Sequence, residues 1–286
     1  EFFILLIQST MIFYYMKKTL IVPGSRVDKL PKLLKSITIF CKYLYHKYVR
    51  NITKPKYYPY HYDGVATRHN CSFMTSEIFI KSHARGVKAF DFESNLPFRV
   101  HQAIWAAHTA LHVEGDLVEL GTGRGFMMSA VLESIENWEK LDRNVWLFDT
   151  FKSSIPDKEG NQNNKDKFKL YAKSFEETRK NFSQWSRINL IRGKLTGSLV
   201  EKKESTPSPY EQIDKICFLH IDLNYPETEV ECLNMLWPKI SRGGIVLLDD
   251  YAYIGFEKSY NLMNLQSKKF DRLILTTASG QGIIVK

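Results

Sequence analysis

Cysteine is scarce in this sequence, and its spacing fits no metal site. The 286 residues include only Cys41, Cys71, Cys217 and Cys232, with no C-x-x-C pair and no matching histidines. Cys217 and Cys232 fall in runs that read as a core strand and a helix. The spacing excludes a cysteine–histidine zinc site, and we expect reduced thiols in a cytoplasmic protein.

An apolar run long enough to cross a membrane is also lacking. The strongly apolar residues 1–16 are fewer than the roughly 20 of a spanning helix, and Gln8-Ser9-Thr10 interrupts them. They have neither the positively charged start nor the small-residue cleavage site of a secretory signal. Because the sequence begins with Glu, we expect Met11 or Met16 to be the true start.

Acidic residues are nearly absent from residues 17–60. This region has eleven lysines and arginines against one acid, Asp28, which gives a net charge of +10. Since the whole chain carries +9 and Glu1 contributes −1, residues 61–286 sum to zero. A nucleic-acid-binding enzyme would carry its positive charge around the active cleft, so we predict no nucleic-acid partner.

The basic region contains an amphipathic pattern. Between Asp28 and Arg50, apolar residues recur near helical spacing among lysines, which predicts a basic helix. Such a helix suits an anionic membrane surface, contacted peripherally through residues 17–56. It suits equally well docking on its own domain or on a partner subunit in a homo-oligomer. The sequence leaves both open.

The centre of the sequence is a glycine turn between a strand and a helix. Asp116–Leu120 reads as a buried strand, Gly121-Thr-Gly-Arg-Gly125 as the turn, and residues 126–135 as a helix. A backbone without side chains can approach a nucleotide-like ligand closely there. The third glycine comes one position too early for the dinucleotide fingerprint G-x-G-x-x-G. An acid in the strand, Glu119, followed by G-x-G-x-G, instead has the look of an S-adenosylmethionine (SAM) site.

Strands and helices alternate along the rest of the chain. Further strands are predicted at 145–149, 188–192, 216–222, 245–249, 272–276 and 282–285, and helices at 98–111, 171–185, 228–237 and 255–265. Residues 51–64 read as a linker or loop, and 238–244 as a turn. The pattern predicts an α/β, Rossmann-like fold with a mostly parallel seven-stranded sheet and helices on both faces. We divide the chain into an N-terminal extension (1–60), a helical lead-in or lid (61–112) and the main domain (113–286).

Acidic residues end several of these strands, where ligands bind in open α/β sheets. Asp149 ends the second strand beside the glycine turn and suits hydrogen bonds from ribose hydroxyls; the alternative is a cap for the next turn. Asp222, Asp249 and Asp250 end neighbouring strands and suit one hard cation, Mg²⁺ or Ca²⁺. The alternative is that the last two only cap a turn.

The motifs together resemble the macrocin O-methyltransferase family of class I SAM-dependent enzymes. The resemblance rests on Leu219-His-Ile-Asp-Leu-Asn-Tyr-Pro-Glu-Thr228 and Gly243-Gly-Ile-Val-Leu-Leu-Asp-Asp-Tyr251. The glycine turn, Phe148-Asp-Thr-Phe151 and Gly193 match in order and spacing. It covers roughly residues 95–286, and the extension lies outside it.

The resemblance implies a cofactor, a metal and a reaction. The glycines would cradle the methionine part of SAM, Asp149 would hold the ribose, and the residues near Gly193 would border the adenine. The implied cofactor-binding set is Glu119, Gly121, Thr122, Gly123, Gly125, Asp149, Gly193 and Lys194. Asp222, Asp249 and Asp250 would bind Mg²⁺, which orients and acidifies a hydroxyl of a sugar, glycan or other hydroxylated small molecule.

One departure from the family concerns the base. Many relatives have a second Asp two residues after the first, whereas this chain has Asn224, whose amide cannot take a proton. His220 shares a strand face with Asp222 and is one candidate base; a metal-bound carboxylate or water is another. Equally, His220 fits a hydrogen-bonded core position. We therefore predict Asp222 and His220 as the catalytic pair.

Two other functions stay open. A nicotinamide-dependent oxidoreductase would need the third glycine one residue later and gives Asp249 and Asp250 no role. A catalytically silent SAM-fold scaffold would explain Asn224 but has no need of converging carboxylates. Gln281, in the closing turn, either reaches the site or serves the turn alone.

Overall fold

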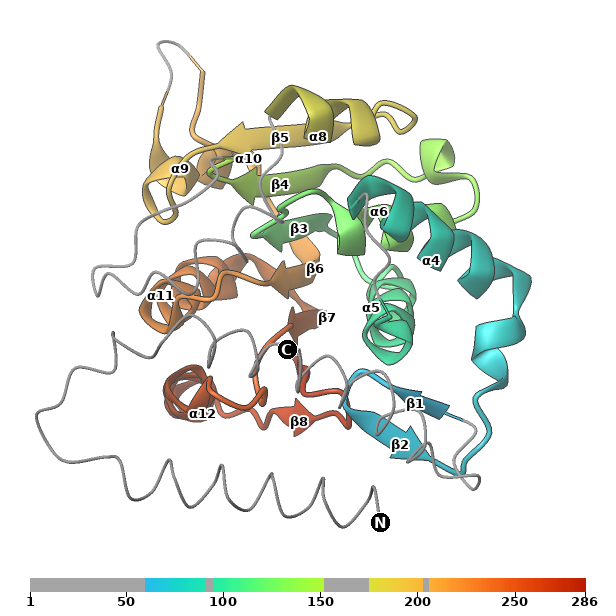
Figure 1. The fold of residues 1–286 in the computed structure, drawn as a ribbon. Helices are drawn as coiled ribbons and strands as arrows, with labels where there is room; N and C mark the ends of the chain where they lie inside the picture. The colour runs from blue at the N-terminus through green and yellow to red at the C-terminus, as the bar shows by residue number, and fades with distance from the viewer. Residues whose placement is uncertain (1–59, 91–94, 152–174, 203–205) are drawn as a thin grey trace, which may run out of the picture. The chain divides into compact units, whose positions relative to one another are not determined.

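The computed structural model describes residues 60–90, 95–151, 175–202 and 206–286 (Figure 1). The basic helix and the apolar start predicted within residues 1–59 lie outside these ranges, as does the predicted helix start at 171–174. In the described ranges, no helix combines the length and the apolar character needed to cross a membrane. Cys71, Cys217 and Cys232 are free thiols, as the spacing predicts.

A seven-stranded sheet forms the middle layer of the described part. Its spatial order is β5-β4-β3-β6-β7-β9-β8, in which the first five strands are parallel and β9 pairs antiparallel with both β7 and β8. The strands are β3 (Asp116–Leu120), β4 (Val145–Asp149), β5 (Ile188–Arg192), β6 (Ile216–Ile221), β7 (Ile240–Leu248), β8 (Leu275–Thr276) and β9 (Gly282–Val285). The predicted mostly parallel sheet is confirmed.

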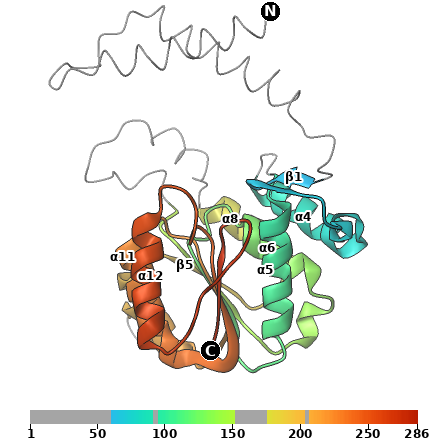
Figure 2. The same ribbon diagram turned by 90° about the horizontal axis from the view of Figure 1, so that it is seen from below.

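Helices cover both faces of this sheet, because the central strands are apolar on both sides. Leu117 faces a cluster that includes Val100, whereas its neighbour Val118 faces a second cluster that includes Leu233. On the first face lie α4 (Glu77–Phe90), α5 (Pro97–Ala110) and α6 (Phe126–Ser134). On the other lie α11 (Pro226–Leu236) and α12 (Glu257–Lys269), as Figure 2 shows.

Short helical turns complete the connections. They are η3 (Ser72–Thr75), η4 (Trp138–Lys140), α8 (Phe175–Asn181), α9 (Gly197–Val200), α10 (Pro209–Gln212) and η6 (Trp237–Lys239). The sequence analysis did not predict η3, η4, α9, α10 or η6, since single turns carry too few residues to show a helical period.

The register brings the ends of the central strands together. Leu120 of β3 pairs with Ile221 of β6, which pairs with Leu248 of β7. The next residues, Gly121, Asp222 and Asp249, therefore leave the sheet side by side. The chain order reverses around β3, which makes this edge the topological switch point where α/β sheets bind ligands.

Two regions differ from the prediction. Residues 60–67 form a hairpin, β1 (Tyr60–Tyr62) and β2 (Val65–Thr67), where we predicted a linker followed by a helical lead-in. Asp63 and Gly64 turn it with φ of 55° and 72°, the left-handed pair of a type I′ turn. Residues 240–244, predicted as a turn, begin β7. A register shift in the β6–β7 pairing absorbs the extra residues there.

Candidate active site

The glycine turn after β3 is closely packed at two of its three glycines and open at the third. A Cβ at Gly121 would lie 1.8 Å from the backbone oxygen of Asp222, and one at Gly125 would lie 2.5 Å from the ring of Phe182. A Cβ at Gly123 would meet nothing within 4 Å. Packing alone therefore demands Gly121 and Gly125, whereas the backbone at Gly123 borders space that a ligand can fill.

Asp149 ties the end of β4 to this turn. Its Oδ2 accepts a hydrogen bond of 2.8 Å from the Gly123 amide, and its Oδ1 accepts one of 2.8 Å from the Phe151 amide. The carboxylate thus caps the next turn and supports the glycine turn at once. Oδ1 also accepts from Thr150 Oγ1 at 3.4 Å, so Oδ2 is the oxygen that can still accept from a ligand.

Two of the other predicted cofactor residues follow β5. Gly193 donates its amide to the Asp149 carbonyl at 3.0 Å, and a Cβ there would come within 2.5 Å of Ser198. Close packing between strand and helix explains this glycine. Lys194 beside it is exposed. Thr122, inside the glycine turn, is buried.

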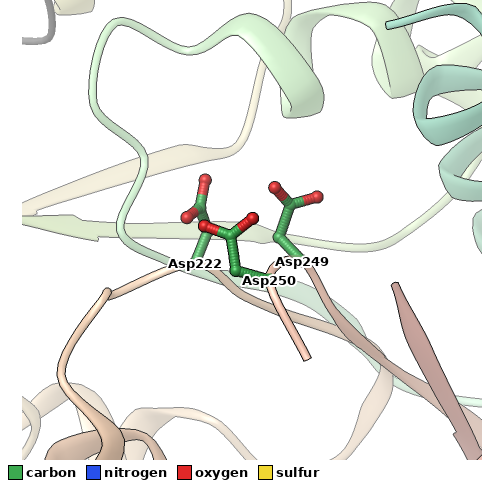
Figure 3. A group of neighbouring side chains, drawn as sticks. All are labelled: Asp222, Asp249 and Asp250. Atoms are coloured by element: carbon green, nitrogen blue, oxygen red, sulfur yellow. The ribbon is translucent and has the colours of Figure 1, made fainter. Parts of the chain in front are cut away.

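Asp222, Asp249 and Asp250 converge beyond β6 and β7. One oxygen from each lies within 4.8 Å of the others, and the three side chains extend to the same side of the strands (Figure 3). The structure therefore brings together the three residues that we predicted as metal ligands.

Charge repulsion makes this cluster suited to a cation. Burial raises the pKa of Asp222 well above its ordinary value, and the charges of Asp249 and Asp250 raise it further. Burial and Asp249 likewise raise the pKa of Asp250. A divalent cation would relieve this repulsion, and a set of carboxylate oxygens is what Mg²⁺ and Ca²⁺ bind. The residues fit such an ion.

Two further side chains reach the cluster. Arg99 of α5 donates from one nitrogen, Nη1, to Asp249 Oδ2 at 2.6 Å and to Asp250 Oδ1 at 2.9 Å. Gln281 donates to Asp249 Oδ1 at 2.7 Å, so it does reach the site. The sequence analysis missed Arg99, because no motif distinguishes a single arginine in a helix from a surface one.

His220 lies beneath the cluster between two carboxylates. Its Nδ1 is 2.9 Å from Glu119 Oε1, its Nε2 is 3.7 Å from Asp249 Oδ1, and the side chain is 1% exposed. Burial alone would lower the pKa of His220, but Asp249 and Glu119 outweigh it and raise the pKa to about 10. The enclosure of His220 and its bond to Glu119 fit the hydrogen-bonded core position, and its role as a base stays a prediction. Glu119, also buried, contacts His220 from the neighbouring strand.

Asn224 is exposed just beyond β6, with φ of 57°. Asn and Asp both tolerate this left-handed conformation, so the backbone does not explain the departure from the family.

Comparison with known proteins matches residues 99–263 to the family model of macrocin-O-methyltransferase (TylF). The chain belongs to this family. Demethyldecarbamoylnovobiocin O-methyltransferase of Streptomyces niveus is 32% identical over 148 residues, which are 49% of this chain and 54% of that protein. A Streptomyces olivaceus protein, 8-demethyl-8-(2,3-dimethoxy-alpha-L-rhamnosyl)-tetracenomycin-C 4'-O-methyltransferase, is 28% identical over 150 residues, 49% of this chain and 54% of its own. The chain thus spans about half the length of these curated relatives.

The fold comparison agrees with the family. The structure of the O-methyltransferase NovP has a TM-score of 0.57 and 21% identity, covering 75% of this chain and 99% of that one. The TylF-family chain therefore has the predicted Rossmann-like class I methyltransferase fold.

Proposed function

We propose that this TylF-family chain is a SAM-dependent O-methyltransferase that uses a divalent cation, with Mg²⁺ as the expected ion. The observation that carries the proposal is the contact between the two predicted sites. Gly121 of the glycine turn packs directly on the backbone of Asp222 in the acidic cluster. A cofactor on the turn and a hydroxyl at the cluster would therefore be neighbours, as methyl transfer between them requires.

The chain's own residues would divide the work as follows. The backbone around Gly123 and the carboxylate of Asp149 would hold SAM, which supplies a methyl group on a reactive sulfonium. Asp222, Asp249 and Asp250 would hold the cation, which supplies a Lewis acid that lowers the pKa of an acceptor hydroxyl. Placing oxygen and methyl in line would then be the main contribution of the protein.

Neither His220 nor Asn224 suits the role of the base that removes the proton from the acceptor hydroxyl. His220 is enclosed, and its Nε2 lies 3.7 Å from Asp249 Oδ1, so we assign it to positioning Asp249 rather than to taking the proton. Asn224 cannot accept one. We therefore expect the proton to leave to an oxygen at the acidic cluster, either a ligand carboxylate or water.

For the acceptor, we propose a hydroxyl on a sugar or on another hydroxylated small molecule. The names of both curated relatives describe O-methylation of elaborate small molecules, one of them bearing a rhamnosyl group. These names support a sugar-like acceptor.

Metal dependence is the expected result that tests this proposal. We expect the purified protein, given SAM and a panel of deoxysugar-bearing acceptors, to release S-adenosylhomocysteine with at least one. Chelation of divalent ions should lower that rate by about 100-fold or more, and added Mg²⁺ should restore it. Mass spectrometry of S-adenosylhomocysteine and of the methylated product measures both. An unchanged rate under chelation would contradict the metal's role.

A further inference from the structure

We propose that Arg99 is a positioning residue for the divalent-cation ligands, and that the β1–β2 hairpin fixes Arg99 in place through Asp63. The inference rests on the proposed function, since it assumes that Asp222, Asp249 and Asp250 receive a cation. It adds a residue and a distant structural element to that site.

Arg99 holds two consecutive aspartates on one side. Asp249 and Asp250 follow β7 in a bend, where the alternation of a strand no longer fixes the directions of their side chains. The two bonds from the single Nη1, at 2.6 and 2.9 Å, hold both carboxylates on one side. Each bond takes only one oxygen of its carboxylate, and the other oxygen of Asp249 accepts from Gln281 at 2.7 Å.

The first turn of α5, which carries Arg99, is capped from outside the helix. Its N-cap residue, Leu96, has no side chain that can cap. Asp63 does so instead: its Oδ2 accepts from the Phe98 amide at 2.7 Å and from the Arg99 amide at 3.3 Å. Asp63 lies in the tight turn of the hairpin. The hairpin therefore fixes the start of α5 and, with it, the backbone position of Arg99.

Tyr60 stabilises this cap. Its hydroxyl donates to Asp63 Oδ2 at 3.1 Å, and its ring packs edge-on against Phe98 at 4.6 Å. Tyr60 is fully buried. At the far end of the Arg99 side chain, the guanidinium lies 5.7 Å from the centre of the Tyr253 ring. The arginine is therefore held at its backbone and at its charged end.

The contacts of Arg99 favour a clamp over a substitute for the metal. Its Nη1 bonds one oxygen each of Asp249 and Asp250, and no hydrogen bond joins it to Asp222 among the described residues. One oxygen from each of the three aspartates still lies within 4.8 Å of the others. Arg99 and a cation can therefore contact the same cluster together.

A titration with Mn²⁺, followed by electron paramagnetic resonance, tests the inference. Lysine keeps the charge, but its shorter side chain cannot place an ammonium where Nη1 lies, so Arg99→Lys should weaken Mn²⁺ binding about 10- to 100-fold and change the shape of the bound spectrum. The matched control is Arg143→Lys, since Arg143 donates to carbonyls before β3, at the opposite end of the sheet. This control should bind Mn²⁺ as the parent does, even if its thermal midpoint falls.

Asp63→Ala is the second variant, because it leaves Arg99 and its charge intact even if Arg99→Lys fails to fold. It should weaken Mn²⁺ binding in the same direction. Unchanged Mn²⁺ affinity in Asp63→Ala overturns the role of the hairpin, and unchanged affinity in Arg99→Lys overturns the role of the arginine. Tighter binding in Arg99→Gln would make Arg99 a competitor of the metal, which also overturns the inference.

A parallel titration with S-adenosylhomocysteine separates this inference from the function beneath it. A parent protein that binds the nucleoside but no Mn²⁺ would overturn the inference and leave the SAM-dependent function standing. A parent protein that binds neither would overturn both.

Discussion

Asp222→Ala is expected to lower methyl transfer by at least about 100-fold and to weaken Mg²⁺ binding to a similar extent. Asp222 is the cluster member whose pKa burial and its like-charged neighbours raise most clearly, so its carboxylate gains most from a cation. The same repulsion means that the metal-free variant should unfold at a temperature no lower than the parent. Steady-state kinetics, calorimetry with Mg²⁺ and a thermal scan without metal measure the three effects.

The control for this variant is Asp214→Ala, which removes an exposed carboxylate just before β6, at the other end of the sheet. It should leave kcat, Mg²⁺ affinity and thermal midpoint unchanged. If Asp222→Ala kept full activity while still binding S-adenosylhomocysteine, the acidic cluster would have no part in the reaction.

Two glycine variants are expected to separate folding from cofactor binding. Gly121→Ala drives a methyl group into the Asp222 carbonyl, 1.8 Å away, and should destabilise the protein by more than about 4 kcal/mol. Gly123→Ala meets no neighbour and should cost only the left-handed backbone, about 1–2 kcal/mol. Its methyl group would instead enter the space assigned to SAM, so affinity for S-adenosylhomocysteine should fall more than stability does.

Urea unfolding and calorimetry on both variants provide the comparison. We expect Gly121→Ala to lower mainly the free energy of unfolding and Gly123→Ala to lower mainly the affinity for S-adenosylhomocysteine. Parent-like affinity in a folded Gly123→Ala protein would mean that no ligand occupies the open side of the turn.

The buried strands were the easiest elements to predict from sequence. Asp116–Leu120, Val145–Asp149 and Ile188–Arg192 have the predicted bounds. Parallel strands covered on both faces are short apolar runs between polar turns, so both ends show in the sequence. Because the ends of parallel strands meet, the convergence of the acidic cluster follows from the same pattern.

The hairpin and the role of Arg99 could not be predicted from the sequence. Asp63-Gly64 is a strong hairpin signal, yet three-residue strands in a Pro- and Tyr-rich stretch hide it. Arg99 contacts Asp249 and Asp250, about 150 positions later in the chain, and only the packing of α5 on the sheet brings them together. His220 remained ambiguous for the same reason, since Glu119 lies on β3 and Asp249 lies just after β7.

Calorimetric titration with S-adenosylhomocysteine, with NAD as the control ligand, tests the central claim most directly. The account predicts micromolar binding of S-adenosylhomocysteine, no heat with NAD, and weaker binding of S-adenosylhomocysteine to Asp149→Ala, which loses the bond to the glycine turn. Binding of NAD in its place would favour an oxidoreductase. Binding of neither ligand by the folded protein would contradict a SAM-dependent function and favour a silent scaffold.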